Sequence, residues 1–121
     1  MTTLENARIK LNAIDHKMTG LFEKMMVSKN TQNAEQKTIK KQLEQLKQKR
    51  MIIIKEVALY KYRHGLPIYD PQREQELIKR NCELLTDKTY LNDYLVFIND
   101  ILNESKAFQK QIITSLHPDE Q

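Results

Sequence analysis

The stretch VALYKYRHGLPIYDPQRE, which spans Val57–Glu74, predicts a corner between two helices. Gly65 suits the left-handed conformation that often follows the last turn of a helix, and Pro67 prevents the helix from continuing. Asp70 is a good N-cap, and Pro71 is favoured in the first turn of a new helix. The sequence therefore predicts that one helix ends just before Gly65 and that the next begins after Asp70.

On both sides of this corner the chain has the composition of an all-α protein. Only two glycines and three prolines interrupt it, and no alternation of apolar and polar residues is long enough for a strand. Helical spacing of apolar residues predicts a first segment over about Leu4–Val27, a continuation over about Ala34–His64, a helix that starts at Pro71 and carries apolar residues to Leu85, and a last long helix with an apolar stripe from Leu91 to Ile112. We expect residues 115–121 to form a flexible tail.

The composition indicates a single domain over residues 1–121. About 40% of the residues are hydrophobic and 30% are charged, and no apolar run approaches the roughly 20 residues of a membrane span. The start MTTLENARIK lacks the apolar middle of a secretory signal, so we expect a cytoplasmic protein that makes no contact with a membrane. The single cysteine, Cys82, cannot form an internal disulfide, and the three histidines lack the spacing of a shared metal site.

The net charge of +4 and the pI of about 9.1 raise the question of nucleic-acid binding. The basic run KTIKKQLEQLKQKR, residues 37–50, is the best candidate for such a surface. Its basic residues are interleaved with Gln and Glu, and no aromatic residue or helix-turn-helix pattern accompanies them. We interpret the run as a solvated helix face and expect no nucleic-acid partner.

Five polar side chains fall on the helix stripes that should face the interior. Arg50 and Lys61 are eleven residues apart, about three turns, so they point the same way. Ser105 and Gln109 are one turn apart on the last helix, and Arg8 lies on the stripe of the first. Any one of the cations could be a snorkelling side chain at a helix end. Because a buried unpaired cation is costly, the set together predicts a pocket for a small anion such as a carboxylate.

The opening stretch resembles the most recognisable segment of the all-helical chorismate mutase family, a Lys near a helix end followed by a G-x-P-I-x-D-P-x-R-E corner. Three more pieces are similar to family segments in the same order: ARIKLNAIDHKM to the opening L-R-x-x-I-D-x-I-D signature, KRMIIIKEVALYK to the second half of the long first helix, and ESKAFQKQ to the closing S-x-x-x-Q. The resemblance implies a type II-like helical bundle that converts chorismate, a small dicarboxylate, to prephenate without a cofactor or a metal.

The resemblance also implies which residues bind the substrate carboxylates. Arg8 and Arg50 would hold them, with Ser105 assisting at the ring carboxylate. Lys61 would touch a carboxylate as well. The reaction is a pericyclic rearrangement that needs neither a nucleophile nor a proton transfer, and the sequence offers no evident pair of general acid and base.

The remaining residues implied by the family act at the reacting bond and at the ring hydroxyl. Lys61 and Gln109 would face the ether oxygen, where electron density builds up, and with Arg50 they form the expected catalytic set. Glu74 and the Asp70 region would bind the ring hydroxyl. Arg73 is expected to be a structural ion-pair partner, and the charges of Lys61 and Arg73 should keep Glu74 ionised.

The chain departs from the family in its first helix, which is normally continuous and whose N-terminal Arg usually reaches the partner subunit's site. About 25 extra residues, close to seven helical turns, separate the Arg8 piece from the Arg50 piece. We assign an inserted arm to about residues 27–46. The polar run SKNTQN, residues 28–33, contains weak helix formers and predicts an antiparallel hairpin that turns near Gln32. Such a hairpin would pair Met25 with Ile39, Leu21 with Leu43, Met18 with Leu46, Ile14 with Arg50 and Arg8 with Glu56.

The same pairing arises if two unbroken helices cross antiparallel in a homodimer. The sequence therefore leaves open a monomer whose own Arg8 completes the site and a homodimer with shared sites, and the polar break favours the hairpin. Two other functions remain alternatives: an isochorismate pyruvate-lyase, whose known members share this fold, and a non-catalytic helical interaction or regulatory module. An association with another enzyme of aromatic amino-acid biosynthesis also stays open.

Overall fold

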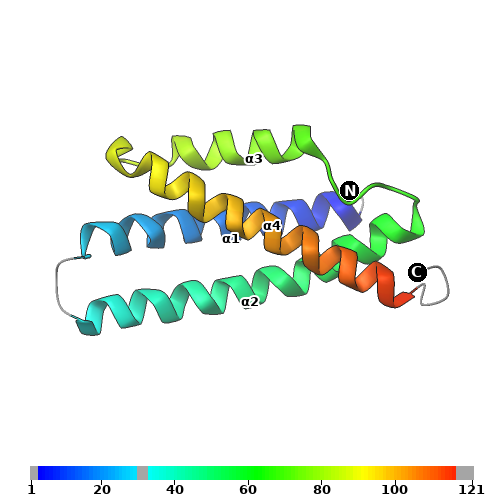
Figure 1. Ribbon diagram of the computed structural model, residues 1–121, viewed down its shortest axis with the longest axis horizontal. Coiled ribbons are helices and arrows are strands. Elements are labelled where there is room, and N and C mark those ends of the chain that lie inside the picture. Colours follow the sequence, from blue (N-terminus) through cyan, green and yellow to red (C-terminus); the bar gives the residue numbers. More distant parts are fainter. Residues whose placement is uncertain (1–2, 30–32, 117–121) are drawn as a thin grey trace.

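The computed structural model describes residues 3–29 and 33–116, which form an all-helical bundle (Figure 1). The helices are α1 (Thr3–Val27), α2 (Asn33–Arg63), α3 (Pro71–Glu83) and α4 (Leu91–Leu116), with a short 3₁₀ helix η1 (Lys88–Tyr90) before α4. No strand occurs within these residues. The predicted all-α class is confirmed, and so is the break between the first two helical segments. Helix α4 continues to Leu116, and the rest of the predicted tail lies outside the described residues.

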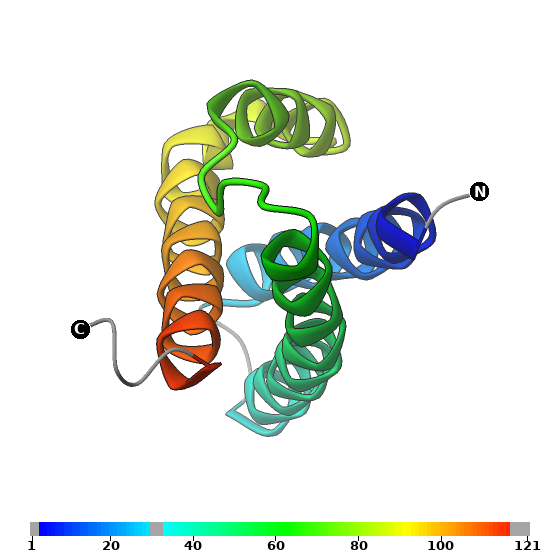
Figure 2. The same cartoon turned by 90° about the vertical axis from the view of Figure 1, so that its right-hand side faces the viewer.

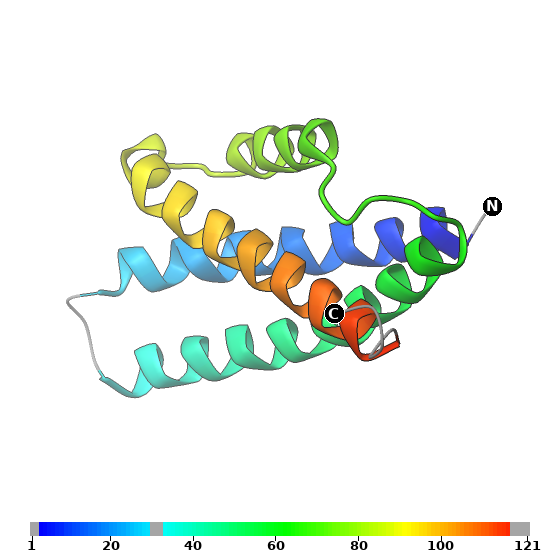
Figure 3. The same cartoon turned by 45° about the vertical axis from the view of Figure 1, so that its right-hand side comes forward.

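Helices α1 and α2 lie side by side and run antiparallel along the length of the molecule (Figure 1 and Figure 3). Helix α4 crosses this hairpin obliquely and packs mainly against α2, and it also contacts α3. The view along the bundle shows α3 on the side away from α2, where it contacts both α1 and α4 (Figure 2). All four helices therefore surround one interior.

The contacts between α1 and α2 agree with the predicted hairpin register. Met18, Ile39 and Leu43 form one buried cluster with Ile101 of α4, and Ile14, Leu21, Met25 and Leu46 pack against it. Further along the hairpin, the neighbour of Ile14, Asp15, pairs with Arg50. The predicted turn residue, Gln32, lies outside the described residues.

The polar residues near the break satisfy the carbonyl groups at the end of α1. The amide of Gln36, from the first turns of α2, donates hydrogen bonds to the Met25 carbonyl at 2.8 Å and to Ser28 Oγ at 2.9 Å. Ser28 Oγ in turn donates to the Lys24 carbonyl at 2.8 Å. Because the last carbonyls of a helix lack partners within it, these side chains stabilise the point at which α1 ends.

The corner between α2 and α3 has the predicted geometry. Gly65 has a φ of 64°, and the Leu66 N–H bonds to the Lys61 carbonyl at 2.8 Å, which is the pattern of a Schellman helix end. Asp70 caps α3 by accepting a hydrogen bond from the Arg73 N–H at 3.1 Å, and Pro71 occupies the first helical position. This corner carries Lys61 and Asp70 toward the same side of the bundle.

The apolar core is divided into clusters, and buried polar residues lie between them. One cluster centres on Tyr94 and Phe22, whose rings meet edge to face at 5.3 Å. Another joins Ala7 and Leu11 of α1 to Ile54 and Val57 of α2. No helix in the described part of the chain is long and apolar enough to cross a membrane.

Candidate functional site

One pocket in the bundle interior is lined by all seven residues that the sequence predicted to bind a ligand. They come from the four helices and the α2–α3 corner: Arg8, Arg50, Lys61, Asp70, Glu74, Ser105 and Gln109. Apolar residues complete the wall, among them Leu11, Ile54 and Leu102. The predicted substrate roles of these residues stay predictions, and their arrangement decides what the pocket can hold.

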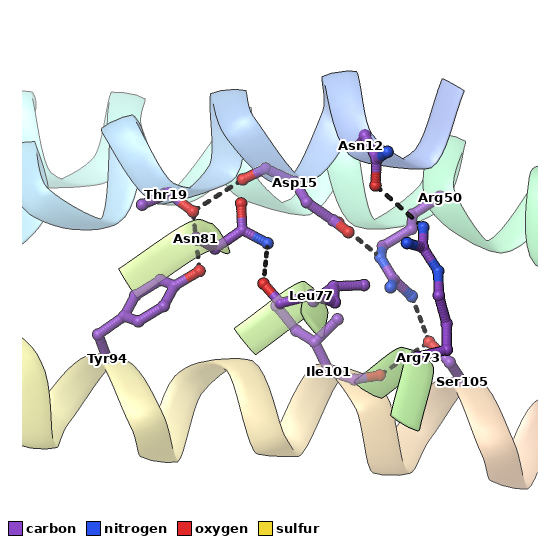
Figure 4. Close-up of polar contacts among 10 residues, drawn as sticks. All are labelled: Asn12, Asp15, Thr19, Arg50, Arg73, Leu77, Asn81, Tyr94, Ile101 and Ser105. Carbon is purple, nitrogen blue, oxygen red and sulfur yellow. Dashed lines mark hydrogen bonds and ion pairs between the residues drawn. The ribbon is translucent and has the colours of Figure 1, made fainter. Parts of the chain in front are cut away.

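Arg50 is the most firmly held cation of the site (Figure 4). Its side chain is almost fully buried, and its Nε donates to Asp15 Oδ1 at 2.8 Å. Its Nη1 donates to Ser105 Oγ, and that hydroxyl donates to the Ile101 carbonyl at 2.8 Å. A guanidinium has five N–H groups, so three remain for a ligand.

Lys61 is buried at the end of α2, and its ammonium is held by a backbone carbonyl. Nζ donates to the carbonyl of Ile68 at 2.9 Å, which ties the α2–α3 corner to the helix. Burial lowers the pKa of Lys61, and the nearby charge of Arg8 lowers it further. The carboxylates of Asp70 and Glu74 oppose this shift of the pKa. A bound anion would favour the charged ammonium in the same way as these carboxylates.

Arg8 and Asp70 face each other at the exposed side of the pocket. Arg8 Nη2 lies 3.7 Å from Asp70 Oδ2, and the two side chains are 35% and 43% exposed. A loose ion pair at this exposure stabilises the fold by at most about 1 kcal/mol. Arg8 can therefore exchange Asp70 for a ligand carboxylate at little cost.

Glu74 has a partner that the sequence did not reveal. Lys106 Nζ lies 3.2 Å from Glu74 Oε1 and also 4.7 Å from the centre of the Tyr69 ring. Lys106 thereby connects α4 to α3 and to the corner. It also adds a cation to the pocket wall.

Gln109 lies in the pocket wall with a buried amide oxygen. The residue is 5% exposed, and no described residue hydrogen bonds with Oε1. Buried polar atoms are nearly always paired in folded proteins. Because an amide oxygen accepts hydrogen bonds, Oε1 could pair only with an N–H or O–H group.

Arg73 joins α3 to α1 through a neutral residue, whereas an ion pair was predicted. Its Nη2 donates to Asn12 Oδ1 at 3.1 Å (Figure 4). Asn12 is an uncharged amide, so this contact is a hydrogen bond and not the expected ion pair. Burial lowers the pKa of Arg73, with Arg8 as the next cause. Arg73 also lines the pocket.

Asp15 is the most important residue of the site that sequence reasoning missed. A signal for it exists, because Ile14 was predicted to lie opposite Arg50 and Asp15 is the next residue. In ARIKLNAIDHKM, Asp15 also aligns with the last D of the L-R-x-x-I-D-x-I-D signature. Lys106 follows Ser105 directly, but nothing in its spacing distinguishes it from a solvated lysine.

The charges of the pocket match a dianion. Five cationic side chains line it, namely Arg8, Arg50, Lys61, Arg73 and Lys106, together with the two carboxylates of Asp70 and Glu74. Asp15 neutralises Arg50 from behind the wall. Two formal positive charges are left without a carboxylate, which is the charge that a small dicarboxylate would balance. No group of three or more His, Cys, Asp or Glu residues in the described part of the chain could hold a metal ion.

Comparison with known proteins identifies the family. The family model described as chorismate mutase type II matches residues 32–110, which include α2, α3 and most of α4. Helix α1, with Arg8 and Asp15, lies outside the matched residues. Searches of the curated proteins and of the solved structures each found no match. Because the family model covers well over half of the chain, the protein belongs to the chorismate mutase type II family.

Proposed function

We propose that the protein is a chorismate mutase, an isomerase that rearranges chorismate to prephenate without a cofactor. The observation that carries this proposal is the meeting of seven predicted polar side chains, from four helices and a corner, in one pocket. The two uncompensated positive charges of that pocket suit the two carboxylates of chorismate. Family membership makes this substrate the first to test.

The proposed mechanism relies on confinement and on fixed charge. Arg8 and Arg50 bind the two carboxylates and hold the substrate in the compact conformer in which the new carbon–carbon bond can form. Ser105 assists Arg50 at the ring carboxylate. Holding the reacting atoms together in this way can supply roughly 7–11 kcal/mol of a barrier.

Charge placed at the breaking bond makes the second contribution to lowering the reaction barrier. The ether oxygen gains electron density as its bond to carbon lengthens. Lys61 donates from its ammonium and Gln109 from its amide, and both groups already lie in the wall before the ligand binds. Glu74, with the Asp70 region, accepts a hydrogen bond from the ring hydroxyl. Such preorganised donors are typically worth about 10²–10³ in rate each.

The decisive experiment is an assay of the purified protein with chorismate, with the product identified as prephenate. Lys61→Ala should lower kcat/KM by about 10²-fold or more, because it removes the charged donor at the ether oxygen. Lys55→Ala is the matched control, since Lys55 is an exposed lysine on the same helix. Pyruvate release from isochorismate, with no prephenate from chorismate, would refute the mutase in favour of a lyase. Turnover of neither substrate would favour an interaction module.

We also propose that each chain completes its own site. In this hairpin, Arg8 of α1 lines the same pocket as Arg50 and Lys61 of α2, so no second chain is needed to supply it. To test this, Arg8→Ala and Arg50→Ala chains are unfolded together, refolded and assayed. The mixture should stay as inactive as either variant alone. Recovery of activity would show that sites are shared between chains and would refute closure within one chain.

A further inference from the structure

Asp15 is a buried acid that contacts the site only through Arg50. Its side chain is 1% exposed, that of Arg50 is 4% exposed, and Oδ1 accepts from Arg50 Nε at 2.8 Å. Asp15 is not among the residues that line the pocket. Its second oxygen, Oδ2, is buried without a hydrogen-bond partner among the described residues. The carboxylate is therefore directed to a single partner, Arg50.

The contacts of Arg50 divide its guanidinium into a held edge and a free edge. Asp15 holds Nε from α1, and Ser105 holds Nη1 from α4 (Figure 4). Two anchors on different nitrogen atoms, supplied by different helices, fix both the position and the plane of the group. The free edge consists of Nη2 and the second N–H of Nη1, which can bind a carboxylate through two parallel hydrogen bonds.

We propose that Asp15 is a positioning residue of the site, which holds Arg50 in the orientation that presents its free edge to a ligand carboxylate. This rests on the proposed function for the identity of the ligand. Asp15 also cancels the charge of Arg50. Arg50 therefore orients the ligand carboxylate more than it attracts the ligand. The attraction for the dianion comes from Arg8, Lys61 and the other cations of the wall.

Three variants separate positioning from stability. Asp15→Leu removes the anchor, and Asp15→Asn keeps an oxygen that can accept from Nε. Tyr94→Phe is the matched control, because it removes a hydroxyl from the same buried layer without contact to Arg50. The Thr19 hydroxyl donates its one hydrogen to the Asp15 carbonyl, so Tyr94 must be the donor to Thr19 at 2.8 Å. The control loses that donor and leaves Thr19 bonded.

We expect Asp15→Leu to lower kcat/KM about 10²-fold, because a small misplacement of a substrate-binding group costs about this much. The affinity for a non-reactive dicarboxylate analogue of the transition state should fall in parallel. Asp15→Asn should retain about a tenth of the activity, because a neutral amide oxygen holds Nε less firmly than a carboxylate does, and Tyr94→Phe should stay within about twofold of the original protein. If Asp15→Leu does not fold, Asp15→Asn is compared with Tyr94→Phe in its place. Asp15 variants that match Tyr94→Phe in activity and affinity would overturn the proposal.

A double variant tests whether Asp15 acts through Arg50. In an Arg50→Ala background, Asp15→Leu should lower kcat/KM no further, because the group it positions is gone. The melting temperature should even recover in the double variant, since removing both partners of a buried pair leaves no uncompensated charge. A further loss of about 10²-fold in this background would show that Asp15 acts independently of Arg50.

A measurement on the free protein keeps this proposal separate from the proposed function. Hydrogen exchange of the Arg50 Nε–H, followed by NMR, should be slow in the original protein and in Tyr94→Phe. It should be fast in Asp15→Leu, because the anchored donor is released. Equal protection in Asp15→Leu would overturn the positioning role even in an active enzyme. Absence of chorismate turnover by a protein with the expected exchange pattern and analogue affinity would instead refute only the proposed reaction.

Discussion

Arg50 and Lys61 illustrate two ways in which a buried cation is retained in this bundle. Arg50 has a carboxylate partner at 2.8 Å, and breaking such a buried pair typically costs about 3–5 kcal/mol. Lys61 hydrogen bonds to the neutral carbonyl of Ile68 at 2.9 Å, and Asp70 and Glu74 act on it only as nearby charges. Lys61 therefore keeps a lowered pKa in the free protein, whereas the charge of Arg50 is cancelled by Asp15.

The lowered pKa of Lys61 predicts opposite pH trends for activity and stability. If the charged ammonium acts at the ether oxygen, kcat/KM should fall as pH rises through a midpoint below the usual lysine value of about 10.4. Between that midpoint and about 10.4 the unfolded chain binds more protons at this position, so the Lys61 contribution to the free energy of unfolding increases with pH. Deprotonation of Lys61 therefore does not destabilise the fold in this pH range, so it cannot cause a loss of activity there through unfolding.

This prediction is checked by measuring kcat/KM and circular dichroism on the same samples across alkaline pH. Burial raises the pKa of Tyr94 to about 12, so the buried hydroxyl keeps its proton over this range. The kcat profile should have a higher midpoint than that of kcat/KM, because a bound dianion favours the ammonium. Lys55→Ala should leave both profiles unchanged. A kcat/KM midpoint at or above the usual lysine value would contradict a role for the buried ammonium.

At the scale of the helices, replacing each of the two glycines by Ala is predicted to change the free energy of unfolding in opposite directions. Gly65 has a φ of 64°, which costs an L-residue roughly 1–2 kcal/mol, and a Cβ there would meet no atom within 4 Å. Gly65→Ala should therefore lower the free energy of unfolding by conformational strain alone. Gly20 lies exposed within α1, and an added Cβ there also meets no atom within 4 Å. Gly20→Ala should raise the free energy of unfolding by about 0.5–1 kcal/mol.

Urea unfolding of the two variants checks this pair of predictions, and an unchanged m value would show that the comparison is valid. Activity provides a second reading, since Gly65 follows Lys61 at the corner of the site and Gly20 is remote from the pocket. Gly65→Ala should reduce turnover along with stability, and Gly20→Ala should leave turnover unchanged. If both variants changed the free energy of unfolding in the same direction, the helix end assigned at Gly65 would be contradicted.

The helices could be predicted from the sequence because their ends depend on local chemistry. Gly65 and Pro71 set the corner through backbone preferences, and the polar run before Ala34 marked the break in the first segment. The 3₁₀ helix η1 was not predicted. The carboxylate of Glu23, on α1, accepts hydrogen bonds from the N–H groups of Thr86 and Asp87 at 2.9 Å, and so holds the loop that precedes η1. That contact joins segments far apart in sequence, and no local pattern encodes it.

The site shows the same division between local and distant information. Helical periodicity placed Arg50, Lys61 and Gln109 on interior faces, because a polar side chain on an apolar stripe is conspicuous in one helix alone. Asp15 and Lys106 could not be recognised in this way, since each is defined by a partner on another helix. Asp15 requires the register between α1 and α2 to be known to within one residue, and Lys106 requires the position of α3 over α4.

For the molecule as a whole, the α1–α2 hairpin is the reason for proposing that each chain completes its own site. Helices α1 and α2 belong to one chain and share a seam whose buried residues on α1 run from Ala7 to Met18. The pocket lies where this seam meets α3 and α4, so every helix contributes to it. A ligand bound there would therefore link all the helices, and a complete site would need no second copy.

This arrangement predicts that the activity per chain does not depend on protein concentration. Dilution of the enzyme from micromolar to nanomolar concentration should leave kcat/KM unchanged, whereas sites shared between chains would be lost as an obligate dimer dissociates. Sedimentation at each concentration supplies the matching measurement of mass. Arg8→Ala should have the same low kcat/KM at every dilution, and it is the control for loss of protein to surfaces. A fall in kcat/KM that coincides with a fall in mass would show that the seam between α1 and α2 forms between two chains.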